Sequence, residues 1–180
     1  MNMTPRNIIL FALAIGVGLV AGFVYPIIGL LLLIPVLGYI AFILFNNKGA
    51  GVADEGAAQA ARQFIAADGK AAIYIMRDGF VGGQQGMNVV IDDSLTSQFR
   101  TGRFVVAEVE PGEHVITGRM AAQTKGSAVS HSVTLGAGEC ILLDAKLNVG
   151  ALQGKLEFLE TRDPAQARSK LAKLKLVEWQ

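Results

Sequence analysis

Two histidines are the side chains of this sequence best suited to acid–base or metal chemistry. His114 follows the turn Pro111-Gly112-Glu113, and His131 is the only other histidine. A catalytic histidine needs a base partner, and a metal-binding histidine needs further ligands. The spacing of His131 to carboxylates fits no ligand pattern. The sequence therefore favours a structural role for His114, whose ring would hydrogen-bond a neighbouring strand or turn.

The adjacent carboxylates Asp92 and Asp93 follow a predicted strand. Aspartates at a turn usually accept hydrogen bonds from backbone amides. A calcium site would need several more oxygen ligands. We therefore expect a turn here, and we predict no metal site.

Cys140 is the only cysteine, which excludes an intrachain disulfide and any metal site built on several cysteines. Ile141, Leu142 and Leu143 follow it and indicate a thiol within a strand. A reactive thiol would need a nearby base, and the spacing suggests none. We expect this thiol to be inert.

The stretch from Gly79 to Gly86 is rich in glycine but lacks the lysine and the helix of a phosphate-binding loop. We interpret it as a long mobile hairpin loop and as the best candidate surface for a partner. The candidate contact residues are Gly79, Phe80, Gly82 and Gly83. Because no catalytic arrangement is found, the sequence predicts a protein that is not an enzyme and uses no cofactor.

Residues 7–47 contain no Asp, Glu, Lys, Arg or His and are mostly apolar, which is typical of a membrane segment. One helix over 7–45 would measure roughly 58 Å, almost twice the hydrocarbon thickness of about 30 Å. Tyr25-Pro26 is the natural break. The sequence thus predicts two transmembrane helices, 8–24 and 27–45, the second kinked at Pro35. A signal peptide over 1–21 is the alternative.

Ala14, Gly18 and Gly22 form a stripe of small residues on the first predicted helix. Such stripes allow two helices to approach closely. The stripe could pack on the second helix of the same chain, or on a second copy or another membrane protein. We favour the same chain, because the turn between the two helices is short.

The charges that flank the apolar stretch predict the topology. Arg6 precedes it, Lys48 and Arg62 follow it, and the positive-inside rule then places both ends in the cytoplasm. We therefore expect a multi-pass protein of a bacterial inner membrane. Its partners would be the lipid bilayer and other membrane proteins or a second copy. The net charge of +1, without a basic cluster among aromatics, argues against nucleic acid.

The predicted fold class is a membrane α-helical hairpin plus an all-β domain. After the two-helix transmembrane hairpin (1–47), a linker and connector helix occupy 48–69, capped at Asp54. Over 70–161, short β-rich runs alternate with turn signals, which favours an antiparallel β-sandwich of about seven strands with flanking helices. The predicted strands are 71–77, 88–92, 103–109, 114–121, 130–135, 140–147 and 155–160.

Residues 162–180 are predicted to form a basic amphipathic helix, with Asp163 as its cap and Pro164 in its first turn. This helix could cover the sandwich and leave its charges solvated. Alternatively, its basic face could contact anionic lipid headgroups. The residues that would face lipid are Arg168, Lys170, Lys173 and Lys175.

Three segments together make up one pattern along the chain. It begins with a strand that contains an aromatic residue and an arginine, and a strand that ends in Asp follows. A Gly-aromatic step, Pro-Gly-x-His and a late strand after Ala-Gly complete it. The segments are AAIYIMRDG, VVIDDSLTSQFRTGRFVVAEVEPGEHVI and AGECILL. In this pattern, residues 70–160 resemble the bacterial family called domain of unknown function 2846. The positions that carry the resemblance are Tyr74, Arg77, Asp92, Gly102, Phe104, Pro111, Gly112, His114, Ala137 and Gly138.

The resemblance implies a small prealbumin-like or immunoglobulin-like β-sandwich, often found on lipoproteins of the bacterial envelope. It would place the β-domain in the periplasm, in contrast to the charge rule. The chain departs from the family because no cysteine follows a signal segment, so it cannot be lipidated there.

These observations predict a non-catalytic binding or accessory subunit of a membrane complex. The alternative is a membrane-anchored module that binds a glycan or a small ligand. Such a module would need an exposed aromatic platform. The available aromatic residues are Tyr74, Phe80, Phe99, Phe104 and Phe158.

Overall fold

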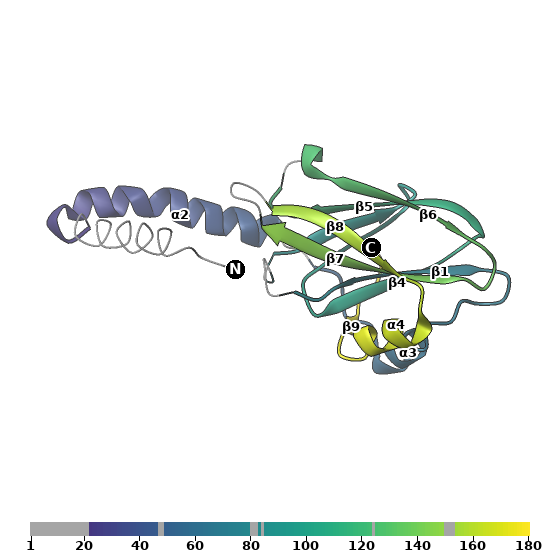
Figure 1. Ribbon diagram of the computed structural model, residues 1–180. Helices are drawn as coiled ribbons and strands as arrows, with labels where there is room; N and C mark the ends of the chain where they lie inside the picture. Colours follow the sequence, from purple (N-terminus) through teal and green to yellow (C-terminus); the bar gives the residue numbers. More distant parts are fainter. Residues whose placement is uncertain (1–21, 47–48, 80–82, 84, 124, 150–153) are drawn as a thin grey trace, which may run out of the picture. The chain divides into compact units, whose positions relative to one another are not determined.

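The computed structural model describes residues 22–46, 49–79, 83, 85–123, 125–149 and 154–180 (Figure 1). The chain divides into two compact units, Met1–Leu44 and Phe45–Gln180. The long helix α2 (Pro26–Asn46) begins at the predicted break and contains Pro35. Residues 22–24, before this break, are also helical.

Among the described residues, no helix is long and apolar enough to span a membrane. The predicted hairpin needs two spanning helices, and residues 8–21 of the first lie outside the described part, with Ala14 and Gly18. The two-helix transmembrane hairpin is therefore wrong. The multi-pass location in a bacterial inner membrane, which depended on it, is also corrected.

Gly22, the third residue of the predicted small-residue stripe, lies beside α2. A Cβ atom added at Gly29 would come within 3.1 Å of the Gly22 Cα atom. The absence of a side chain at both positions thus allows the backbone to turn tightly around Tyr25-Pro26.

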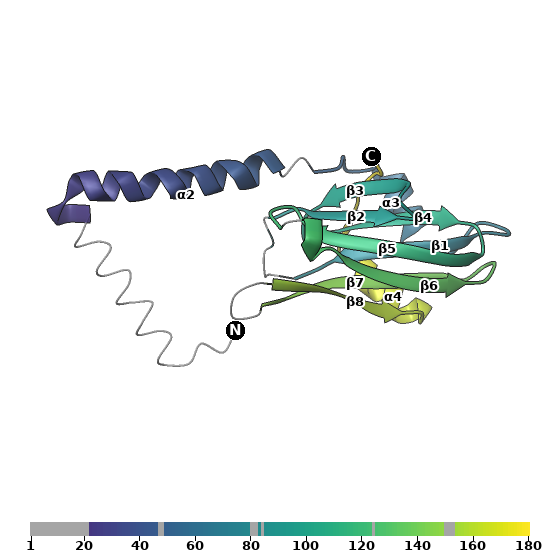
Figure 2. The ribbon, with the colours of Figure 1, turned by 90° about the horizontal axis from the view of Figure 1, so that it is seen from above.

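The described residues of the second unit form nine strands in two sheets (Figures 1 and 2). The orders are β8-β7-β1-β4-β9 and β3-β2-β5-β6. The strands are β1 (Ala71–Arg77), β2 (Met87–Ile91), β3 (Leu95–Phe99), β4 (Arg103–Val109), β5 (Gly112–Met120), β6 (Val129–Leu135), β7 (Cys140–Val149), β8 (Gly154–Thr161) and β9 (Lys175–Leu176). Helices α3 (Glu55–Ala61) and α4 (Pro164–Leu171) and the 3-10 turn η1 (Lys125–Ser127) complete the unit.

The predicted strands are found within two residues of their expected ends, but the predicted seven-stranded antiparallel arrangement is wrong. β3 and β9 are additional strands, and β1 pairs with β7, and β4 with β9, in parallel. The middle of β3 is Thr-Ser-Gln, which lacks the apolar alternation of a strand. β9 has only two residues, too few to produce any periodic pattern.

The five-stranded sheet is buried on both faces. Ile73 and Ile75 of β1 face the other sheet, whereas Tyr74 and Met76 belong to a second cluster on the opposite face. That cluster includes buried residues of α3, α4 and the edge strand β9, and the two helices cover the outer face in Figure 1. The unit therefore has three layers: the four-stranded sheet, the five-stranded sheet and the helices.

Both helices of the second unit begin at aspartate caps. Asp54 accepts a hydrogen bond from the Ala57 amide at 3.0 Å, and Asp163 accepts one from the Gln166 amide at 2.7 Å. The helix predicted over 162–180 extends only over Pro164–Leu171. It ends there because Leu174, Leu176 and Val177 are buried against the sheets in an extended segment.

Segments from both ends of the second unit cover the outer edges of β3 and β9. The amide of Ala50 donates to Gln98 O at 2.7 Å, and the amide of Gln180 donates to Thr96 O at 2.7 Å. Beside β9, Ala53 donates to Leu176 O at 3.1 Å. One side of the double sheet is thus closed by backbone hydrogen bonds.

Candidate functional site

The turn before β5 and the turn after β2 meet through His114 and Asp92. His114 Nδ1 lies 2.6 Å from Asp92 Oδ2, and His114 Nε2 lies 2.7 Å from the Glu110 carbonyl oxygen. The other carboxylate oxygen of Asp92 accepts the Val115 amide at 2.8 Å. Asp92 has a left-handed backbone (φ 49°), which aspartate tolerates better than most residues. We call this arrangement the His114–Asp92 latch.

The latch is suited to holding two turns together. Both ring nitrogens of His114 are engaged, and the residue is only 9% exposed. Neither nitrogen is free to take a proton from a substrate or to bind a metal. Within the described ranges, no group of three His, Cys, Asp or Glu side chains is placed to hold a metal ion. The geometry agrees with the structural role expected for His114.

The latch favours the ionised forms of both side chains. Burial lowers the pKa of His114, but the hydrogen bonds to Asp92 and Glu110 outweigh it, so the net pKa is raised. Burial raises the pKa of Asp92, but the bonds from His114 and the Val115 amide outweigh it, so the net pKa is lowered. An imidazolium donating from both nitrogens satisfies a carboxylate and a carbonyl together.

We expect the latch to make stability depend on pH. The contribution of His114 is present below its ordinary pKa of 6.5 and is lost as the pH rises through the raised pKa of the folded state. The contribution of Asp92 is present above 3.8 and is lost as the pH falls through its lowered pKa. Between about pH 5.5 and pH 8.5 the latch should lose about 1 kcal/mol. This is less than the roughly 1.5–3 kcal/mol of a buried hydrogen bond between charged groups, because the Asp92 side chain is 39% exposed and solvent screens the pair.

Urea unfolding of the wild type and of Asp92→Asn at both pH values measures this loss. Asparagine keeps the shape of the side chain but removes the charge, so the variant should lose less stability between the two pH values. The control variant is Asp93→Asn, whose stability should change between the two pH values by as much as that of the wild type. Equal pH dependence in the wild type and Asp92→Asn would contradict the ionised latch.

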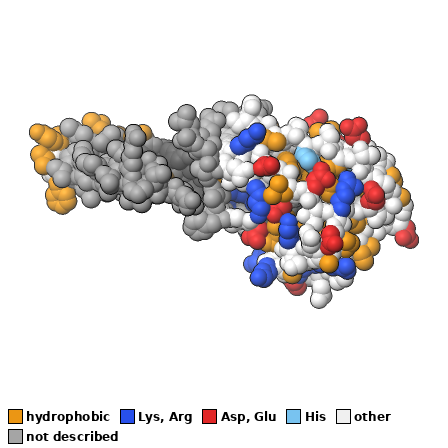
Figure 3. Space-filling model, in the orientation of Figure 1, with side chains coloured by type: hydrophobic (Ala, Val, Ile, Leu, Met, Phe, Trp, Pro, Cys, Tyr) orange, Lys and Arg blue, Asp and Glu red, His pale blue; other side chains and the backbone are white. Residues whose placement is uncertain are grey.

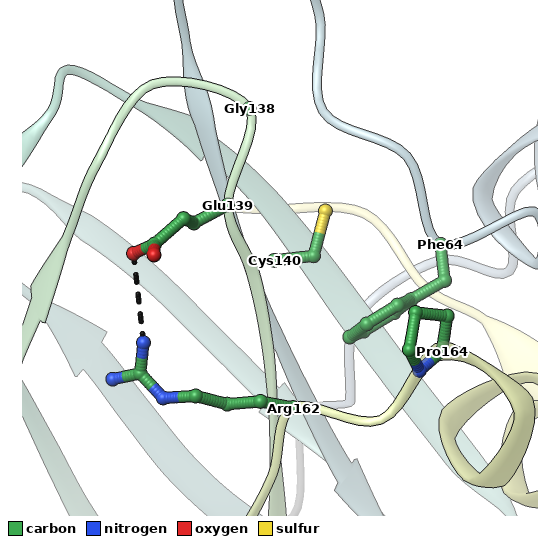
Figure 4. A pocket seen from close by; sticks show the side chains of 6 residues that line it. All are labelled: Phe64, Gly138, Glu139, Cys140, Arg162 and Pro164. Carbon is green, nitrogen blue, oxygen red and sulfur yellow. Dashed lines mark ion pairs between the residues drawn. The ribbon is translucent and has the colours of Figure 1, made fainter.

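Cys140 lines a pocket of about 270 Å³ between the start of β7 and the start of α4. Figure 4 shows the thiol between Phe64 and Pro164 on one side and the pair formed by Glu139 and Arg162 on the other. The Glu139 carboxylate and the Arg162 guanidinium are 3.5 Å apart.

The polar groups of this pocket are already occupied. Arg162 also donates to Thr134 O at 3.4 Å, and burial raises the pKa of the Cys140 thiol. A thiol of raised pKa is a poor nucleophile at neutral pH. The pocket thus contains no activated nucleophile, in agreement with the inert thiol expected from the sequence.

A charged cluster that local sequence patterns do not predict lies beneath α4. Asp144 is 3% exposed, and its Oδ2 atom lies 3.0 Å from Lys146 Nζ and 3.5 Å from Lys170 Nζ. Asp144 would face solvent in a bare sandwich, but α4 covers that face and supplies Lys170. The run Cys-Ile-Leu-Leu before Asp144 could have indicated burial of both faces.

The predicted partner loop is only partly described. Gly79 is held by Thr101, whose hydroxyl lies 3.0 Å from the Gly79 amide and 2.9 Å from its carbonyl oxygen. Gly83 lies in a turn. Phe80 and Gly82 lie outside the described residues. Nearby, the buried Arg77 donates to Gln85 O at 2.5 Å and thereby ties β1 to the segment that leads into β2.

The four basic residues predicted to face lipid do not share one helical face. Arg168 donates to Pro164 O of its own helix, Lys170 contacts Asp144, Lys173 follows α4 and Lys175 lies in β9. On the face shown in Figure 3, cationic and anionic side chains are intermixed. With the membrane location corrected, the lipid-facing interpretation is not retained.

The aromatic residues offered as a ligand platform are mostly in the core. Tyr74, Phe99, Phe104 and Phe158 are all buried. Burial raises the pKa of Tyr74 to about 12. Phe80 lies outside the described residues, so the described part of the chain presents none of the five as an exposed platform.

Helix α2 exposes large apolar side chains on more than one face. Their exposed fractions range from 46% to 81%. The residues are Ile27, Leu30, Leu31, Leu33, Ile34, Leu37, Ile40 and Phe45. Extended apolar surfaces of this kind usually mark interaction sites. We call these residues the α2 apolar surface.

The sequence matches no family model and no curated protein. The resemblance to domain of unknown function 2846 therefore stays a prediction.

Proposed function

We propose that this protein is a non-catalytic accessory subunit that binds a partner protein through the α2 apolar surface and carries the β-domain of residues 45–180. The observation that supports this proposal is the exposure of so many large apolar side chains along one helix. Leaving such surface in water is unfavourable by about 25 cal/mol per Å². A partner that buries it would therefore gain substantial binding free energy.

The chemistry of α2 favours an apolar helix as the contacting element of the partner. Residues 7–47 have no charged side chain, so the contact needs no complementary charge. Ile27, Leu30, Ile34 and Leu37 recur at helical spacing and form a continuous stripe. Apolar stripes of this type bind other helices or apolar grooves through anchors at successive turns.

Site-specific photo-crosslinking in the native cell tests the proposal. A photoreactive residue is placed at Leu30, Ile34 or Leu37 of the full chain, and at Val115 as a control. Val115 is 41% exposed but lies on β5. We expect one and the same partner protein from the three α2 positions and not from Val115.

A charge on the stripe should also weaken the complex. Ile34→Lys would bury an unpaired ammonium in the contact, and we expect at least about tenfold weaker association, which is about 1.4 kcal/mol. Val115→Lys is the matched control and should leave association unchanged. Crosslinks from α2 only to other copies of this chain, or undiminished association of Ile34→Lys, would refute the accessory-subunit proposal.

A further inference from the structure

The two sheets have one closed side and one open side. Residues 49–53 and 177–180 cover the outer edges of β3 and β9. In the part of the chain that the structure describes, no strand pairs with the outer edges of β6 and β8. The order β3, β2, β5 and β6 can be followed in Figure 2, so β6 is the edge strand of its own sheet, and β8 of the other sheet lies beyond it in that view.

The free edge of β6 lacks the features that usually prevent strand addition. Edge strands are commonly protected by charged residues or proline. β8 carries Lys155, Glu157 and Glu160, whereas β6, Val-Ser-His-Ser-Val-Thr-Leu, has no Lys, Arg, Asp, Glu or Pro. Its seven residues are long enough to template a further strand.

The contact made by Arg162 identifies which backbone groups of β6 face outward. Its guanidinium donates to Thr134 O, so this carbonyl points away from β5. In an antiparallel pair, alternate residues direct both backbone groups to the same side. Ser132 and Ser130 therefore also present their amides and carbonyls at the free edge. The Arg162 bond is long, at 3.4 Å, and exposed, so releasing it costs little.

The sequence of β6 is nearly symmetric about Ser132. An antiparallel pairing of two copies centred there places Ser130 opposite Thr134 and Val129 opposite Leu135. Hydroxyl residues would thus face hydroxyl residues on the outer face, and Val129 would face Leu135 on the inner face. The exception to the symmetry is His131, which would lie opposite Val133 and is held by Glu160 of its own chain, 2.7 Å away. The same outer face already contains such a contact, since Thr117 Oγ1 lies 3.1 Å from Ser130 Oγ. Cross-strand hydroxyl pairs are favourable, whereas like charges directly opposite would be unfavourable.

From this symmetry we propose that β6 pairs antiparallel with β6 of a second copy of this chain, in register at Ser132. The four-stranded sheets of the two copies then form one continuous sheet across a two-fold axis. A two-fold contact needs a self-complementary surface, which the pattern of β6 supplies. The pairing is independent of the α2 apolar surface.

Disulfide crosslinking of the full chain in a Cys140→Ser background tests both the contact and its register. Ser132→Cys should form a dimer rapidly, because hydrogen-bonded partners lie about 5.5 Å apart. Ser130→Cys alone should react at least about tenfold more slowly, since its two copies would be separated by about 13 Å along the strands. A mixture of Ser130→Cys and Thr134→Cys chains should again crosslink rapidly.

Two further substitutions at Ser132 distinguish this contact from association through any other surface. Ser132→Pro removes an outward amide that β5 does not use, and Ser132→Lys places like charges opposite each other. Each should reduce the mixed 130–134 crosslink at least about tenfold, with an unchanged circular dichroism spectrum. Ser132→Thr is the matched control and should preserve the crosslink. Crosslinking that is independent of position, or that persists in Ser132→Lys, would overturn the proposal.

Discussion

Replacing Phe104 by alanine is expected to lower the free energy of unfolding by about 3–5 kcal/mol, the range for a large aromatic residue removed from a packed core. Phe104 is fully buried on the outer face of the five-stranded sheet, in one cluster with Leu171 and Leu174. In a two-layer sandwich that face would be in water, and the same substitution would cost little. Urea unfolding of the second unit, followed by far-UV circular dichroism, measures the difference.

The control for this substitution is Val115→Ala, because Val115 is 41% exposed on the four-stranded sheet. It should change the free energy of unfolding by no more than about 0.5 kcal/mol. A loss for Phe104→Ala that is no larger than the loss for Val115→Ala would contradict the helical third layer.

The second large effect is expected at Gly118, where β8 crosses over β5. A Cβ atom at Gly118 would lie 2.6 Å from Phe158 Cζ and 2.7 Å from Leu156 Cδ2. Both side chains are buried in the core between the sheets and cannot move away freely. Gly118→Ala should therefore destabilise the protein by about 1–3 kcal/mol, as overpacking does.

Gly126→Ala is the matched control for Gly118→Ala. A Cβ atom at Gly126 would meet no atom within 4 Å, so the same chemical change should be nearly neutral. Equal midpoints of thermal unfolding for the two variants would show that Leu156 and Phe158 do not pack over β5 as described.

Local sequence patterns predict most of the strands because turn residues separate them. Pro111-Gly112 and Asp92-Asp93 mark the ends of strands, and β1 and β4 were predicted with their observed bounds. The pairing was not predictable in the same way. β1 contacts β7 nearly 70 residues later, and no local pattern specifies that this pair is parallel.

A helix that covers the sandwich was one of the two interpretations of residues 162–180, and β1 gives a further indication of such a third layer. Ala-Ala-Ile-Tyr-Ile-Met has no polar residue, and a strand in a half-solvated sheet should alternate. Such a run indicates burial on both faces. The helix that provides this cover, α4, is short and its sequence is mostly polar, so only its packing on the sheet identifies its role.

The candidate site was predicted in type but not in geometry. A structural role for His114 follows from the lack of a suitable partner pattern, yet the partner itself, Asp92, lies 22 residues away in sequence. For the apolar stretch, by contrast, the local features were predicted and the role inferred from them was not confirmed. Its composition and the break at Tyr25-Pro26 were evident, but the transmembrane hairpin inferred from them was wrong.

The way in which residues 175–180 close the second unit also constrains when it can fold. These residues supply β9, which pairs with β4, and they cover the edge of β3. In addition, one of the two neighbours of β1 in the sheet is β7, which is synthesised much later than β1. Non-local pairings of this kind form slowly and leave intermediates with exposed strand edges. During synthesis, the five-stranded sheet cannot be completed, and the edge of β3 cannot be covered, until the last residues of the unit have left the ribosome. The uncovered edges of β3 and β4 are then the surfaces that a chaperone would have to protect.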